Sequence, residues 1–183
     1  MEQDRRQAII DAGLAILREQ GLAGLTQPRV AARTGLRQSH LTYYYPTRAD
    51  LLAAVARAAI SAQQAAARSL GEGVATVDQC VTKLTNAAMR HENTRLLSAL
   101  NQAADQEPEV RAMFNELTEG FVTELGSLLG QLGLPTSAAG VDMLHAVFVG
   151  LSIIELATTR PNGKARSKAA FNLAFDAIAG EQS

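Results

Sequence analysis

A short run of hydrogen-bonding side chains lies between positions 37 and 42. It contains Arg37, Gln38, Ser39 and Thr42. Arginine suits guanine, glutamine suits adenine, and the threonine methyl group suits the methyl group of thymine. We therefore predict that these four residues contact base edges in the major groove of DNA. The alternative is a helix face that is only solvated.

Two short helical patterns joined by a tight turn would position these side chains. The second pattern runs from about Arg37 to Tyr44 and has Leu41 as its inward anchor. The first begins after Thr26, a natural N-cap, and ends before Gly35, which can adopt the left-handed conformation that stops a helix. A polar helix held by few apolar residues is typical of the recognition helix of a helix-turn-helix.

The segment 26–52 resembles the DNA-binding domain of the TetR family of transcriptional repressors. The resemblance rests on Thr26, Val30, Ala31, Gly35, Leu36, Leu41, the Tyr43-Tyr44-Tyr45-Pro46 run, Arg48, Leu51 and Leu52. The family most often has a tyrosine that touches phosphate where this chain has Thr42, so Tyr43 is expected to take over that contact.

Four residues are predicted to contact the phosphate backbone: Thr26, Tyr43, Thr47 and Arg48. Thr26 and Thr47 are expected at helix N-termini, where backbone N–H groups can meet phosphate. Tyr45 is expected to pack in the small core instead.

Composition favours an all-α protein, because alanine and leucine are abundant, aromatic residues make up 4% and Trp is absent. The net charge is −1, but residues 1–60 hold eight Arg and five acidic residues, a balance of +3 that coincides with the helix-turn-helix. We expect a DNA-binding domain at 1–46 and a helical regulatory and dimerisation domain at 47–183. The single cysteine, Cys80, could be a redox sensor, although inert packing is the simpler interpretation.

Helix signals recur along the whole chain. Asp4 with Gln7, and Thr47 with Asp50, have the spacing of capping boxes. The helix from Thr47 is expected to continue to about Leu70. Later helices are predicted at 76–91, 93–104, 107–132, 136–159 and 165–179.

The last two predicted helices are candidates for a homodimer interface, two from each subunit forming a four-helix bundle, and the TetR resemblance implies the same arrangement. The candidate residues are Val141, Leu144, Phe148, Leu151, Phe171, Phe175 and Ile178. The alternative is that both helices are central in a monomer core.

An apolar pocket for a small ligand could lie between the helices of the second domain. Its candidate lining residues are Met89, Met113, Phe114, Leu117, Phe121, His145 and Phe148. Each could equally be ordinary core, and His145 could be an interface histidine.

The chain shows no glycine-rich phosphate loop, catalytic triad or metal-ligand spacing, so we predict no enzyme activity, cofactor or metal. We also expect no signal peptide and no apolar run of the roughly 18–20 residues that span a bilayer. The predicted function is a cytoplasmic homodimeric repressor that binds a palindromic or near-palindromic operator and is released by a small, largely apolar effector. The alternative is a helical sensor or enzyme that retains the fold without operator binding.

Overall fold

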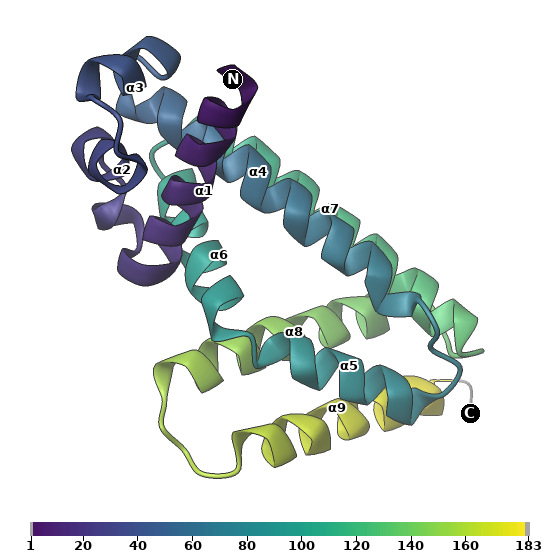
Figure 1. Ribbon diagram of the computed structural model, residues 1–183. Helices are drawn as coiled ribbons and strands as arrows, with labels where there is room; N and C mark the ends of the chain where they lie inside the picture. The colour runs from purple at the N-terminus through teal and green to yellow at the C-terminus, as the bar shows by residue number, and fades with distance from the viewer. Residues whose placement is uncertain (1, 182–183) are drawn as a thin grey trace. The chain divides into compact units, whose positions relative to one another are not determined.

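The computed structural model describes residues 2–181, whose regular elements are all helices with no strand, so the predicted all-α class is confirmed (Figure 1). The elements in order are α1 (Glu2–Gln20), η1 (Leu22–Gly24), α2 (Gln27–Thr34), α3 (Gln38–Tyr44), α4 (Arg48–Arg68), η2 (Ser69–Gly71), α5 (Val77–Ala88), α6 (His91–Ala104), α7 (Pro108–Gln131), α8 (Ala138–Ala157) and α9 (Gly163–Gly180).

One predicted helix start is wrong. Asp4 does not cap α1, because the helix already includes Glu2, and the Gln7 side chain bonds Asp11 one turn further along at 2.9 Å. The caps at Thr26 and Thr47 are confirmed. The Thr26 hydroxyl accepts from the backbone N–H of Arg29, and the Thr47 hydroxyl accepts from that of Asp50 at 3.0 Å.

The chain forms two compact units, and each has its own apolar core. Unit 1 comprises residues 1–63 and 95–117, and unit 2 comprises residues 64–94 and 118–183. This division differs from the predicted boundary after residue 46, because the first part of α4 buries Leu51, Leu52 and Val55 in the same core as the helix-turn-helix. The α4 helix itself is continuous past residue 63.

Unit 1 places α1 against α2 and α2 against α3, which makes a three-helix arrangement at the N-terminal end of the chain (Figure 1). Ile9, Ile16 and Leu17 of α1 are fully or almost fully buried, and so is Leu25 in the α1–α2 connection. In unit 2, α9 packs on both α5 and α8, with Phe171 at 0% exposure in the shared core.

Helix α8 corrects the expectation that no segment is long and apolar enough to span a membrane. By length and composition alone it qualifies, with 20 residues and a mean hydropathy of 1.6. Among the described residues it is the one such helix, which is weak evidence, because core helices of soluble proteins meet the same criteria. Only 28% of its apolar stretch is buried, however, so much of α8 faces outward.

Candidate nucleic-acid interface

The turn between α2 and α3 has the predicted geometry. Gly35 adopts a left-handed conformation with φ 69°, which a residue with a side chain rarely adopts. The N–H of Leu36 then donates to the carbonyl of Ala31 at 3.1 Å and closes the end of α2. Leu41 is fully buried and is the sole buried residue of α3. The other six residues of this helix are therefore presented at, or near, the surface.

The predicted base-contacting residues lie together on and just before α3. Arg37 is the N-cap and not the first helical residue, and its side chain is exposed, as are those of Gln38 and Ser39. Thr42 is half-buried, and its hydroxyl donates back to the carbonyls of Gln38 and Ser39, both at 3.1 Å. Its hydroxyl is thus used within the helix, which leaves the methyl group as the part suited to a base.

The three tyrosines that end α3 have different environments. Tyr43 is 76% exposed, and its ring meets the edge of Tyr44 at a centroid distance of 5.3 Å. The guanidinium of Arg6, from α1, lies 5.2 Å from the centroid of the Tyr44 ring, a cation–π distance. Tyr45 is buried, as expected. Tyr43 is therefore the tyrosine available to a phosphate.

At the start of α4, Thr47 and Asp50 form a closed capping box. The backbone N–H and the hydroxyl of Thr47 both donate to Oδ2 of Asp50, at 2.9 and 2.7 Å. These bonds hold the pKa of Asp50 below its ordinary value. The N–H and hydroxyl of Thr47 itself are thus engaged within the box, and a phosphate contact at this helix N-terminus stays a prediction.

Two further side chains join the segment between α1 and α2 to the segment between α3 and α4. Neither role was predicted from the sequence. Arg48 donates from Nε to the carbonyl of Leu25 at 3.1 Å and from Nη2 to that of Leu22 at 3.2 Å. Gln27 donates to the carbonyls of Tyr45 at 2.7 Å and Pro46 at 3.2 Å. No local sequence pattern predicts such bonds, because the partners are 18 to 26 positions apart.

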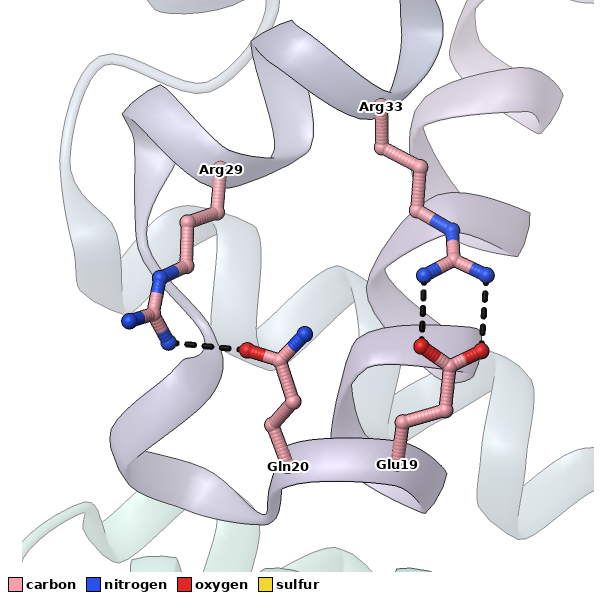
Figure 2. A network of polar contacts seen from close by, with 4 residues as sticks. All are labelled: Glu19, Gln20, Arg29 and Arg33. Atoms are coloured by element: carbon pink, nitrogen blue, oxygen red, sulfur yellow. Dashed lines mark hydrogen bonds and ion pairs between the residues drawn. The ribbon is translucent and has the colours of Figure 1, made fainter.

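A polar clasp joins the end of α1 to α2 (Figure 2). Arg33 makes two bonds of 2.7 Å to the carboxylate of Glu19, and Arg29 bonds the Gln20 side chain at 2.8 Å. The hydrogen bonds with Arg33 lower the pKa of Glu19. Both arginines belong to the basic excess of the N-terminal segment, but here they hold α2 against α1.

Residues 9–55 match the family profile described as "Bacterial regulatory proteins, tetR family". Solved structures share the fold along almost the whole chain. A protein of Mesorhizobium loti MAFF303099 described as a TetR-family transcriptional regulator superposes with a TM-score of 0.80 at 17% identity, covering 98% of this chain and 96% of that one. Residues 9–55 thus carry the DNA-binding domain of the TetR family.

Two further solved structures show how far the fold is shared. A Rhodococcus protein described as a TetR-family regulator has a TM-score of 0.75 at 22% identity, covering 96% of this chain and 99% of the other. A Saccharomonospora viridis protein described as a transcriptional regulator, solved in complex with choline, has a TM-score of 0.82 at 13% identity, covering 95% and 96%. No curated protein matches the sequence. The chain thus shares its overall fold with these proteins, and its N-terminal segment matches the family profile.

The predicted ligand-pocket residues divide between the two units of the protein. Met113, Phe114 and Leu117 pack on the core of unit 1. In unit 2, the Phe121 ring lies 5.5 Å from that of His145 and 5.0 Å from that of Phe148, measured between centroids. The seventh candidate, Met89, is half-buried at the end of α5.

The cluster of Phe121, His145 and Phe148 joins α7 to α8 and is half-buried. Burial lowers the pKa of His145, and the nearby Asp142 carboxylate opposes that shift. The imidazole is therefore neutral at neutral pH and acts as an aromatic surface beside the two phenylalanines.

Most of the predicted dimer-interface residues lie inside unit 2. Val141, Leu144, Phe171, Phe175 and Ile178 are between 0 and 6% exposed within a single chain, while Phe148 and Leu151 are half-buried. Side chains in an intramolecular core cannot also cover a partner. The apolar residues that do face outward were missed: Val149 (45%), Ile153 (44%) and Ile154 (42%) on α8, and Leu173 (71%) on α9.

Cys80 is buried in α5, and burial raises the pKa of its thiol to about 12. The thiolate, which is the reactive form, is therefore negligible at neutral pH. This supports inert packing over a redox role.

Proposed function

We propose that this protein is a cytoplasmic transcriptional repressor that binds operator DNA through α3. The observation that carries the proposal is the exposed polar face of that helix. Arg37, Gln38 and Ser39 extend outward while Leu41 anchors the helix. Arg37, Gln38, Ser39 and Thr42 contact base edges, and Thr26 and Tyr43 contact phosphates on either side.

The repressor acts as a homodimer through the outward face of unit 2. Val149, Ile153 and Ile154 expose nearly half of their surface on α8, and Leu173 exposes most of its surface on α9. A cluster of large apolar side chains on one face is typical of a protein–protein contact. A two-fold dimer would present two α3 helices to a palindromic or near-palindromic site.

An effector that releases the operator binds beside the aromatic cluster of Phe121, His145 and Phe148. Three aromatic rings with few polar neighbours suit a small, largely apolar molecule. The continuous α4 helix joins the unit that contains α3 to the unit that contains this cluster. By linkage, operator DNA must weaken effector binding by the same factor as the effector weakens operator binding, about 5- to 150-fold.

Selection of bound sequences from a pool of random duplex DNA tests the proposal. We expect enrichment of an inverted repeat whose half-sites are roughly 34–36 Å apart, or a multiple of that distance. Selection without enrichment at moderate salt would reject the repressor and favour a helical sensor that retains the fold without operator binding.

A further inference from the structure

The guanidinium of Arg48 forks across the connection between α1 and α2. Nε donates to the carbonyl of Leu25 and Nη2 to that of Leu22, although Arg48 itself begins α4. Gln27, the first residue of α2, makes the reciprocal connection to the carbonyls of Tyr45 and Pro46, which join α3 to α4. The two side chains therefore tie residues 22–27, between α1 and the start of α2, to residues 45–48, which follow the recognition helix.

These bonds matter because α3 has little else to fix its direction. It is seven residues long and buries one side chain, Leu41. Carbonyls in turns and at helix ends often need donors from outside the helix. The Leu22 carbonyl also accepts from the backbone N–H of Leu25 at 3.1 Å, so the guanidinium is its second donor. Charged donors make the stronger bonds of this kind, and two donors of one guanidinium also fix an angle.

We propose that Arg48 and Gln27 are positioning residues for the recognition helix. They hold the C-terminal end of α3 at the angle that base contact requires, and Arg48 acts through the carbonyls of Leu22 and Leu25 instead of binding phosphate. The inference rests on the proposed operator binding, and it replaces the predicted phosphate contact of Arg48.

The test uses the operator selected by the wild-type protein, with random duplex DNA as the second probe. Arg48→Met removes both bonds, and Gln27→Met removes the reciprocal pair without changing charge. Each variant should bind the operator roughly 5- to 150-fold more weakly, the effect of one mismatched base pair. Affinity for random duplex and the salt slope should stay unchanged, because the slope counts neutralised phosphates.

Arg48→Lys separates charge from geometry. A lysine keeps the positive charge, but its donors share one nitrogen and cannot reproduce the fixed spacing of the guanidinium donors. This variant should therefore bind the operator as weakly as Arg48→Met. Arg57→Met is the matched control, because Arg57 lies on the same helix and pairs with Glu109 on the surface. It should bind the operator like the wild type.

Three outcomes would overturn the inference. One is a salt slope reduced by about one unit in Arg48→Met with equal weakening on both DNAs, the result for a phosphate contact. The second is full rescue by Arg48→Lys, and the third is wild-type affinity in Gln27→Met. If Arg48→Met is unfolded by circular dichroism, Gln27→Met decides. Failure of the wild type to select any operator would reject the proposed function before a variant is made.

Discussion

Helix α3 and the C-terminal half of α8 distribute their side chains in opposite ways. In α3, the single buried residue is apolar and the exposed residues are polar. In α8, Ser152 and Glu155 are buried, whereas Val149, Ile153 and Ile154 are exposed. Each helix leaves an exposed face for another molecule to cover, but the two faces differ in their side-chain chemistry. The polar face of α3 suits nucleic acid, whereas the apolar face of α8 suits another protein surface.

The buried polar residues of α8 have an internal role that frees its apolar face. The Glu155 carboxylate accepts from Arg166 of α9 at 2.7 Å, and its own side chain is 5% exposed. The Ser152 hydroxyl donates to the carbonyl of Phe148 at 2.8 Å. The Glu155–Arg166 pair thus fastens α8 to α9, the Ser152 bond stays within α8, and apolar side chains are left for a partner.

The largest expected change in the free energy of unfolding comes from a substitution in the core of unit 2, compared with one on its surface. Phe171→Ala should lower the free energy of unfolding by about 3–5 kcal/mol, because a fully buried ring leaves a cavity. Asn172→Ala, at the next position of the same helix but exposed, is the control and should change stability little. Denaturant unfolding measures both. If Phe171→Ala kept wild-type stability but changed the oligomeric state, Phe171 would belong to the dimer interface and not to the core of unit 2.

A charge on the outward face of α8 should break the dimer without unfolding the chain. Ile153→Lys would bury an unpaired ammonium in the proposed interface and weaken association by about 3 kcal/mol or more. Ala112→Lys, at an exposed position of α7, is the control. Light scattering at micromolar concentration should find monomers for the first variant and dimers for the second. If the wild-type protein is itself monomeric, the exposed face of α8 does not bind a second copy of the chain, and this part of the comparison with α3 is wrong.

A smaller effect concerns acid stability in unit 1. The folded-state pKa values of Glu19 and Asp50 lie below the ordinary values of 4.5 and 3.8. Their interactions therefore stabilise the protein above those values and are lost as the pH falls through them. The double variant Glu19→Gln, Asp50→Asn should show a flatter decline of unfolding free energy below pH 4.5. An unchanged decline would show that neither pair contributes.

The smallest effect is an absence of reaction at Cys80. Because the thiol is buried and its pKa is raised to about 12, a thiol-specific disulfide reagent should not modify the native protein at neutral pH. The same reagent should modify one thiol per chain in concentrated guanidinium chloride. Rapid modification of native protein would reopen the redox interpretation.

The sequence predicted what depends on neighbours along the chain. The Thr26 cap, the Gly35 turn, the Leu41 anchor and the Thr47–Asp50 box are local patterns, and the structure confirms all four. The sequence did not predict the bonds of Arg48 and Gln27, because these depend on how distant segments pack.

The sequence also did not predict which faces of the apolar helices are buried within a single chain. Helix α8 is apolar on more than one face, so its hydrophobic pattern cannot decide which face a single chain buries. The prediction therefore assigned Leu144 and Phe171 to the interface, whereas the structure buries both inside unit 2. Residues such as Ile153 could be assigned only from their exposure in the folded chain.

The most direct test repeats the selection from random duplex DNA with Gln38→Ala beside the wild type. Gln38 is exposed on α3, and its loss should relax preference at one base position by about 1–3 kcal/mol. In a two-fold dimer the relaxed position should occur at the same place in both half-sites, with every other position unchanged. Uniform weakening on selected and random DNA, or identical selected sequences, would contradict base recognition by α3.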